Sequence, residues 1–192
     1  MVRRRGVDEV SQKGRRAVHH RYEIVTARLR LHALARDEVR LVLRGERAAL
    51  GARIGASVPT AWPGPDLADA LPVIAGGMAG QPGDERWVWV IVEPRAAALI
   101  GDIGFHGPVS GAKEVEMGYV ILPEFRAHGY ATEAAQALLA WTFAQAGVER
   151  VFLRIAHDNM RSLRVAAKLD MRETDSDEPA YRRFERARPA GD

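Results

Sequence analysis

Alternating apolar and polar residues mark several stretches of the chain, and this period of two is typical of β-strands that bury one face. The strand-like stretches are 28–34, 86–93, 98–105 and 114–122. The first and the last alternate, 86–93 is rich in tryptophan and valine, and 98–105 contains Leu99, Ile100 and Ile103. Turn-forming residues at 93–95 and 107–111 separate the last three stretches. The pattern therefore predicts an antiparallel meander in the middle of the chain.

Apolar residues that recur every three to four positions indicate helices. The predicted helices are 37–50, 67–78, 130–146 and 159–169. Asp37 and Asn159 stand at the starts of two of them, where a short polar side chain caps free N–H groups. A strand at 151–155 and a hairpin at 171–185 complete the pattern. The order β-α-α-βββ-α-β-α-β predicts a mixed α/β (α+β) domain.

Length and composition fit a single globular domain. The chain has 192 residues and no cysteine, which excludes disulfides, thiolate metal sites and a cysteine nucleophile. No apolar run approaches the roughly 18 residues that span a membrane, and no secretory signal is recognisable. We therefore expect a cytoplasmic protein without a membrane partner.

Positive charge concentrates near the start of the chain. Seven lysine and arginine residues between Arg3 and Arg21 stand against two acidic residues, whereas the whole chain has a net charge of +3. We predict a flexible basic extension over 1–24, one domain over 25–187 and a flexible tail over 188–192. Nucleic-acid binding by the extension is a less favoured alternative, which predicts strongly salt-dependent binding.

The strongest chemical signal lies between the last strand of the meander and the longest helix. It reads Arg126-Ala127-His128-Gly129-Tyr130-Ala131-Thr132. Such a loop exposes backbone N–H groups, and the first helical turn adds unpaired N–H groups and the positive end of its dipole. This combination suits a pyrophosphate. The motif alone is weak, because a tight strand–helix loop with a glycine has the same pattern.

Context strengthens the motif. The strand 114–122 precedes the loop, and His157-Asp158-Asn159-Met160-Arg161-Ser162-Leu163 follows about thirty residues after it. Together these segments resemble the GNAT superfamily of N-acetyltransferases, in particular its ribosomal-protein N-terminal acetyltransferase-like branch, over about residues 26–185. The resemblance implies a mostly antiparallel twisted sheet flanked by helices. The family's fourth and fifth strands splay apart in this fold and hold acyl-CoA.

The resemblance also assigns roles to residues. Acetyl-CoA is the implied co-substrate, with its pyrophosphate on the loop and its pantetheine arm along the preceding strand; no metal is implied. The implied cofactor-binding residues are Met117, Gly118, Tyr119, Val120, Ile121, Leu122, Arg126, Ala127, His128, Gly129, Tyr130, Ala131, Thr132, Asn159 and Ser162. Ser162 is also implied to protonate the departing thiolate, and Glu116 to act as general base. One departure is Asp170-Met171, where the branch usually has Gly-Phe; we expect a changed helix cap there.

The chemistry supports a carboxylate base independently of the resemblance. A primary amine has a pKa of about 10 and is protonated at neutral pH, so it must lose a proton before it attacks a thioester. Glu116 and Glu114 share one face of their strand because side chains alternate. The alternative for each is a solvated carboxylate paired with an arginine. For Ser162 the alternative is an ordinary serine in a first helical turn.

Other polar and aromatic residues are weaker leads. His106, His128 and His157 are isolated in the sequence, and no ligand spacing indicates a metal site. Trp62, Trp87 and Trp89 either belong to the core or line the acceptor pocket. We expect Trp87 and Trp89, which share a strand face, to be core residues.

The expected function is N-acetyl transfer from acetyl-CoA to a primary amine. A protein N-terminus and a small-molecule amine both remain open as acceptors, and so do a monomer and a homodimer. The alternative from another functional class is a non-catalytic sensor or adaptor that has the same fold and binds acyl-CoA. It would bind the cofactor without turnover.

Overall fold

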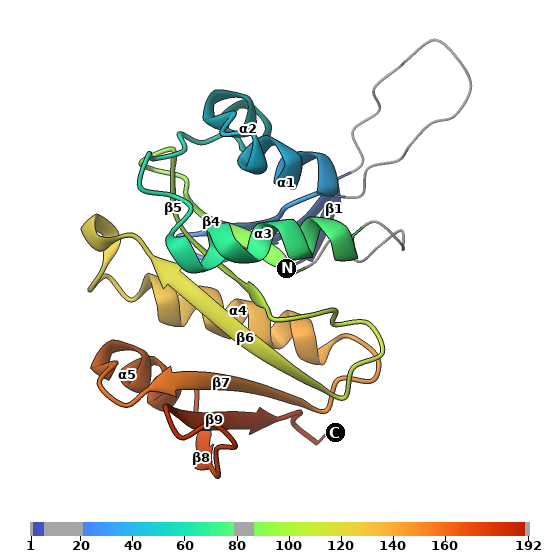
Figure 1. Cartoon of the computed structure of the whole chain (residues 1–192), viewed down its shortest axis with the longest axis vertical. Coiled ribbons are helices and arrows are strands. Elements are labelled where there is room, and N and C mark those ends of the chain that lie inside the picture. Colours follow the sequence, from blue (N-terminus) through green and yellow to red (C-terminus); the bar gives the residue numbers. More distant parts are fainter. Residues whose placement is uncertain (1, 6–20, 79–86, 191–192) are drawn as a thin grey trace.

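A single sheet runs through the computed structural model, which describes residues 2–5, 21–78 and 87–190. It has nine strands in the order β1-β2-β3-β4-β5-β6-β7-β9-β8 (Figure 1). The strands are β1 Val2–Arg5, β2 Arg21–Val25, β3 Arg30–Ala33, β4 Val88–Glu93, β5 Ala98–Phe105, β6 Glu114–Ile121, β7 Arg150–Ala156, β8 Arg172–Thr174 and β9 Tyr181–Ala187. Neighbouring strands are antiparallel except β6 and β7, which are parallel. The mixed α/β class and the central meander β4–β5–β6 are confirmed.

Helices cover both faces of the sheet (Figure 1). They are α1 Arg36–Leu43, α2 Arg47–Ile54, α3 Pro65–Gly77, α4 Tyr130–Phe143 and α5 Met160–Lys168, with a short 3-10 turn, η1, at Pro123–Phe125. Residues of α1, α2 and α3 form one apolar core with one face of the sheet, and α4 forms a second core with the other face. No helix in the described ranges is long and apolar enough to cross a membrane.

The predicted helix 37–50 is wrong as a single element. The chain forms α1 and α2 instead, and Gly45 between them adopts a left-handed φ of 70°. A left-handed residue cannot continue a right-handed helix, and glycine takes this conformation without steric cost. The second helix then runs on to Ile54 and ends at Gly55, which is left-handed as well. The apolar period is interrupted at the break, where residues 44–47 are Arg-Gly-Glu-Arg.

The prediction of an extension up to residue 24 needs correction. Residues 21–25 form β2, which pairs with β3, and Ile24 is only 4% exposed. Val2–Arg5 forms β1 and pairs with β2. Tyr22, Ile24 and Val25 are good strand formers, but the many arginines before them obscured this signal. Residues 6–20 lie outside the described residues. At the other end, the Arg188 backbone N–H donates to the carbonyl of Glu149 at 2.7 Å, so the predicted tail is attached at its first residue.

The expected change in the cap of α5 is present. Asp170 adopts a left-handed φ of 52° at the position where the branch usually has glycine. The N–H of Met171 donates to the Ala166 carbonyl at 3.1 Å, and the N–H of Asp170 donates to the Ala167 carbonyl at 3.2 Å. These are the two hydrogen bonds of a Schellman cap. Aspartate tolerates the left-handed region better than most residues, so the helix still ends at this point.

Candidate active site

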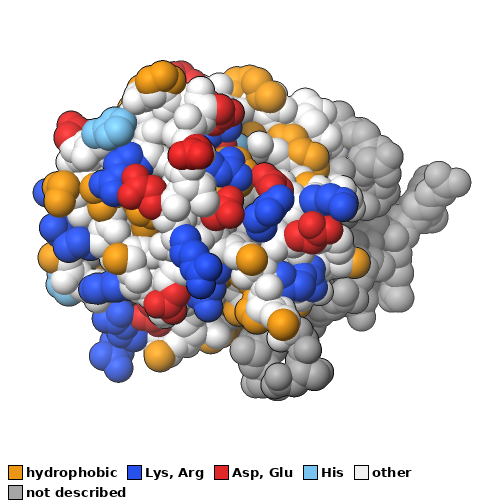
Figure 2. Space-filling view, turned by 90° about the horizontal axis from the view of Figure 1, so that it is seen from below, with side chains coloured by type: hydrophobic (Ala, Val, Ile, Leu, Met, Phe, Trp, Pro, Cys, Tyr) orange, Lys and Arg blue, Asp and Glu red, His pale blue; other side chains and the backbone are white. Residues whose placement is uncertain are grey.

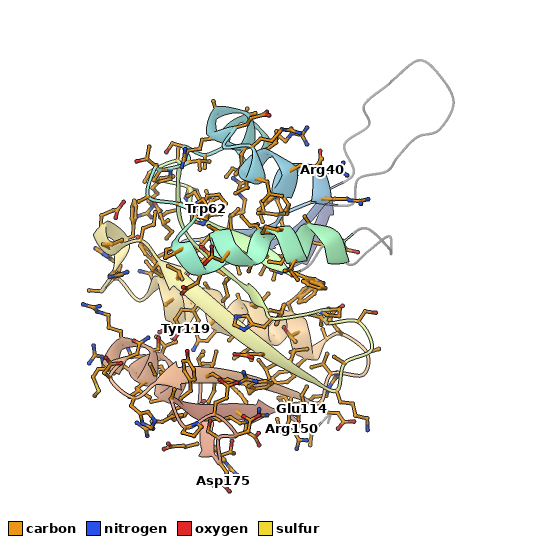
Figure 3. The ribbon with its side chains drawn as sticks, viewed as in Figure 1. Arg40, Trp62, Glu114, Tyr119, Arg150 and Asp175 are labelled. Carbon is orange, nitrogen blue, oxygen red and sulfur yellow. The ribbon has the colours of Figure 1, made fainter. Side chains whose placement is uncertain are left out.

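An open cleft forms where β6 and β7 part. The two strands pair only over residues 114–116 and 150–152. Beyond these residues β6 stays paired with β5 and β7 with β9, so the strands diverge. The cleft has a volume of about 920 Å³ and is lined mainly by α3, β5, β6, β7 and the start of α5. Figure 3 shows Glu114 beside Arg150 at the paired end and Tyr119 farther along β6. The splayed strand pair is therefore confirmed.

Glu116 lies in this cleft with its side chain only 12% exposed. Its Oε1 is 3.3 Å from Nδ1 of His106, and its Oε2 is 3.6 Å from a guanidinium nitrogen of Arg154. The hydrogen bond with Glu116 holds the pKa of His106 above its ordinary value, although partial burial and Arg154 oppose the increase. The carboxylate is thus held from two sides. Neither partner was apparent from the sequence, because each comes from a different strand.

Glu114 has different surroundings although it shares a strand face with Glu116. It forms ion pairs with Arg150 and, at 3.1 Å, with Arg183, and its side chain is 35% exposed. It is not among the residues that line the cleft. Glu114 is therefore a surface carboxylate paired with arginines, which was the alternative weighed for both glutamates.

The loop between β6 and α4 has the backbone geometry of an anion site. Ala127 and Gly129 are left-handed, with φ of 64° and 79°, and α4 begins at Tyr130. Left-handed residues in such a loop turn neighbouring N–H groups toward one side, and the first turn of α4 adds its own unpaired N–H groups. Arg126 turns its side chain back, and its Nε donates to the carbonyl of Ile121 at 2.9 Å. Only its backbone therefore faces the loop.

An ion pair that the sequence did not reveal braces this loop. The Glu133 carboxylate accepts hydrogen bonds from the Thr26 hydroxyl at 2.6 Å and from the Arg28 backbone N–H at 2.9 Å. Arg28 also donates to the carbonyl of His128 at 2.9 Å and lies over the ring of Tyr130. Burial opposes charge on Glu133, but the bonds from Thr26 and Arg28 hold its pKa below its ordinary value. Arg28 and Glu133 are 105 positions apart, so no local pattern indicates their contact.

Asn159, Ser162 and Tyr119 meet where the cleft borders α5. Asn159 caps α5 as predicted, and its Oδ1 accepts a hydrogen bond from the Ser162 N–H at 3.1 Å. The Tyr119 hydroxyl is buried and has no hydrogen-bond partner within the described residues. Burial raises the pKa of Tyr119, and Ser162 lies close enough to oppose this increase without completing a hydrogen bond. Two hydroxyl groups are thus close together in the cleft.

The wall opposite β7 comes mainly from α3. Leu67, Ala70, Val73 and Ile74 line it and make it apolar. Trp87 is partly buried: it packs against the core cluster formed with α1, α2 and α3, and it also lines the cleft. Trp89 is fully buried in the core, and so is Trp62, at 1% exposure. Trp87 stands just before β4, which begins at Val88, and its ring lies against Gly77 of α3.

Asp102 is a cleft residue that the sequence did not single out. It lies on β5, is 8% exposed, and accepts a hydrogen bond from the Trp62 indole N–H at 2.8 Å. Burial raises its pKa to about 6, an increase that the bond from Trp62 opposes and nearby Asp66 supports. A lone aspartate in an apolar strand shows no pattern from which its position could be predicted. No group of three or more potential metal ligands occurs among the residues that the structure describes.

Known proteins of similar sequence are acetyltransferases by name. Residues 28–172 match the acetyltransferase (GNAT) domain family. Uncharacterized N-acetyltransferase YjdG of Bacillus subtilis is 30% identical over 109 residues, which cover 56% of this chain and 65% of YjdG. Uncharacterized N-acetyltransferase YnaD of the same organism is 33% identical over 90 residues, 47% of this chain and 52% of YnaD. The matched part thus spans between half and two thirds of these relatives.

A solved structure shares the fold over nearly its full length. RimL, a ribosomal L7/L12 α-N-protein acetyltransferase in complex with coenzyme A, has a TM-score of 0.61 and 17% identity, covering 86% of this chain and 97% of RimL. At this identity the likeness shows the fold alone. The family match, in contrast, extends over most of the chain and includes both the splayed strands and the loop before α4. This chain therefore belongs to the GNAT acetyltransferase family.

Proposed function

We propose that the protein transfers the acetyl group of acetyl-CoA to a primary amine, with Glu116 as general base. The observation that carries the proposal is the position of Glu116. It is a mostly buried carboxylate in the cleft, on the strand that leads into the anion-binding loop. A protonated amine cannot attack a thioester until a proton acceptor has removed its proton.

The described residues fit acetyl-CoA. The N–H groups of the loop and the first turn of α4, residues 126–132, offer donors to its pyrophosphate. The edge of β6 over residues 117–122 faces the gap left by β7, and backbone groups at such an edge can pair with the amides of a pantetheine arm. Asn159 and Ser162 border the same gap. Acetyl-CoA would supply an activated thioester there.

The chain's own groups account for the proton movements. Glu116 takes a proton from the ammonium form of the acceptor, directly or through water, while His106 and Arg154 hold the carboxylate in place. The amine nitrogen then bonds to the acetyl carbon, and the bond from that carbon to sulfur breaks. Backbone N–H groups of β6 stabilise the oxygen that gains negative charge. The Ser162 hydroxyl gives a proton to the departing sulfur and recovers one from the acetylated nitrogen through solvent.

Acetyl-CoA binding and turnover test the proposal separately. At about 100 times its Kd, acetyl-CoA should raise the free energy of unfolding by about 2.7 kcal/mol, which thermal melts would detect. Gly129→Glu places an anion in the phosphate loop and should abolish this shift. A panel of primary amines with detection of the free thiol measures turnover. No shift at millimolar acetyl-CoA would reject the proposal; binding without turnover on any amine would instead indicate an acyl-CoA sensor or adaptor.

A further inference from the structure

One face of β5 forms a strip along the floor of the cleft. Asp102, Gly104 and His106 lie on this face, because side chains alternate along a strand. The residues between them, Ile103 and Phe105, are buried in the core on the α4 side. Asp102, Gly104 and His106 therefore lie on the α3 side, and all three line the cleft.

A matching strip on β6 lies beside this strip of β5. Gly118 stands opposite Gly104, and the His106 N–H donates to the carbonyl of Glu116 at 3.0 Å. Gly104 and Gly118 lie between Asp102 at one end of this floor and Glu116 at the other. The Trp87 carbonyl oxygen takes the space of a Cβ at Gly104, and the His106 ring takes it at Gly118. Four strand positions separate the two ends, which is about 13 Å along the strand. The floor thus has a carboxylate at each end, with the Trp87 backbone and the His106 ring between them.

The two carboxylates differ in how their charge is balanced. Arg154 pairs with Glu116 and with Glu178, so the Glu116 end of the cleft contains a cation. At the other end, Asp102 accepts only the neutral Trp62 N–H, and the charge of nearby Asp66 adds to its own. No cation of the described residues pairs with Asp102. With a pKa of about 6, this buried group is mostly ionised at neutral pH, and a buried charge without a counter-ion is unfavourable.

The space between these ends suits an apolar chain. Leu67, Ala70, Val73 and Ile74 of α3 line the cleft. Val73 is 73% exposed, so it presents apolar surface to this space. Trp87 also lines the cleft, and its buried indole N–H has no hydrogen-bond partner within the described residues. An acceptor that fits would carry a cation, then an aliphatic spacer, then the reacting amine.

We propose that the acceptor is an aliphatic diamine or polyamine whose distal ammonium group binds Asp102 while its reacting amine lies at Glu116. The inference rests on the proposed function and names its substrate class. Asp102 is then a specificity-determining residue that touches the acceptor but takes no part in proton transfer. The products are a mono-N-acetylated amine and free coenzyme A.

Paired amines of equal length test the second charge. We expect cadaverine to be acetylated with a kcat/KM at least about tenfold above that of pentylamine, because one charge-assisted hydrogen bond is worth about that factor or more. Asp102→Asn should remove most of this preference by raising the KM for cadaverine several-fold more than the KM for pentylamine. Asparagine can still accept the Trp62 N–H, so the fold should be kept. Equal use of the two amines by the parent protein would overturn the proposal.

A matched variant and a binding measurement complete the test. Asp69→Asn removes an exposed carboxylate of α3 outside the cleft lining and should leave the cadaverine preference intact. Cadaverine should raise the Tm of the coenzyme A complex for the parent and for Asp69→Asn but not for Asp102→Asn. This readout needs no turnover, so it separates failure of the diamine site from failure of the proposed function. Equal Tm shifts in all three proteins, or faster acetylation of a peptide N-terminus than of any diamine, would contradict the assignment.

Discussion

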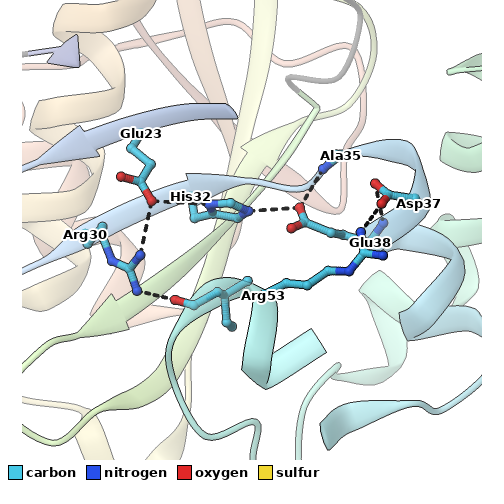
Figure 4. Close-up of polar contacts among 8 residues, drawn as sticks. Glu23, Arg30, His32, Ala35, Asp37, Glu38 and Arg53 are labelled. Atoms are coloured by element: carbon cyan, nitrogen blue, oxygen red, sulfur yellow. Dashed lines mark hydrogen bonds and ion pairs between the residues drawn. The ribbon is translucent and has the colours of Figure 1, made fainter. Parts of the chain in front are cut away.

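Two regions of the molecule bury polar groups in opposite ways. In the first, where β2, β3 and α1 meet, His32 lies between two carboxylates and is 1% exposed (Figure 4). Its Nε2 is 2.9 Å from Glu38 and its Nδ1 is 3.5 Å from Glu23, which also pairs with Arg30 at 3.1 Å. Burial opposes charge on His32, but hydrogen bonds to Glu23 and Glu38 hold its pKa above the ordinary value. We call these four residues the His32 cluster.

Nδ1 of His32 makes no hydrogen bond within the described residues but lies within ion-pair distance of Glu23. The cleft, by contrast, buries polar atoms that have no hydrogen-bond partner within the described residues and take part in no ion pair. They include the Trp87 indole N–H, the Tyr119 hydroxyl and Nε of Arg154. Each such group lowers stability by about 1–3 kcal/mol relative to a satisfied one. The comparison separates two uses of buried polarity. The His32 cluster joins β2, β3 and α1 through hydrogen bonds and ion pairs, whereas the three cleft atoms make no such links between elements.

The largest expected effect is on the His32 cluster. Glu38→Ala leaves His32 and the Ala35 N–H, both bonded to Glu38 at 2.9 Å, without their acceptor. Losing one partner of a buried ion pair should lower the free energy of unfolding by about 3–5 kcal/mol. Urea denaturation measures this, and kcat should stay within about twofold of the parent because the cluster is not part of the cleft lining. Glu46→Ala, which removes an exposed partner of Arg44, is the control and should change stability by less than about 1 kcal/mol. A loss no larger than in the control would mean that the cluster does not stabilise the fold.

Acid should weaken the same cluster. The hydrogen bond from His32 and the charge of Arg30 lower the pKa of Glu23 to about 2, although burial opposes this. Because the pKa is lower in the folded state, the stabilisation is complete above the ordinary pKa of 4.5 and is lost as the pH falls toward 2. The loss should reach about 3 kcal/mol in urea titrations over this range. Glu23→Gln should flatten that part of the curve, and an unchanged acid profile in the variant would contradict the assignment.

In the cleft, removal of a charge should lower kcat without lowering the free energy of unfolding. Glu116→Gln keeps the shape of the side chain and removes the base, so kcat should fall roughly 10²-fold or more, with little change in the Kd of acetyl-CoA. The loss should shrink at high pH, where more of the amine is already deprotonated. Glu114→Gln, two residues earlier on the same face and outside the cleft lining, is the matched control and should keep its kcat. Full kcat for Glu116→Gln from pH 6 to 9 would show that Glu116 is not the base.

The smallest effect should have the opposite sign. Tyr119→Phe removes a buried hydroxyl that has no hydrogen-bond partner within the described residues. It should therefore raise the free energy of unfolding by about 1 kcal/mol, while slowing turnover because the hydroxyl next to Ser162 is lost. Thermal melts and steady-state kinetics would show the two changes together. A destabilised Tyr119→Phe would place the hydroxyl in the structural network and remove the contrast with the His32 cluster.

Surface charge differs from both regions. Figure 2 shows the end of the molecule near β8 and β9, where lysine and arginine side chains alternate with acidic ones. The ion pairs Arg150–Glu114, Arg182–Glu173 and Arg183–Glu114 lie on these strands and their neighbours. Exposed pairs of this kind contribute little to stability. On this face the excess of arginine is largely neutralised, which gives little support to binding of nucleic acid there.

The sequence by itself determined the features that depend on residues a few positions apart. The strand-like runs specified β4, β5 and β6. Gly129 and the helix after it specified the anion-binding loop, and Asn159 specified the start of α5. Even the replacement of glycine by Asp170 was readable as a changed cap. Turns, caps and strand faces are set by local backbone sterics and hydrogen bonds. A short stretch of sequence is therefore enough to predict them.

The tertiary structure decided which side chains meet across the sheet. The partners of Glu116 come from β5 and β7, the Arg28–Glu133 brace joins residues 105 positions apart, and Asp102 became a cleft residue only through strand register. The strand at 21–25 also escaped, because a run of arginines hid its strand formers. The break at Gly45, in contrast, coincides with a polar stretch, 44–47, that the sequence itself contains. Register, strand splay and burial are properties of the whole sheet. They set distances and pKa values that no local pattern in a single sequence encodes.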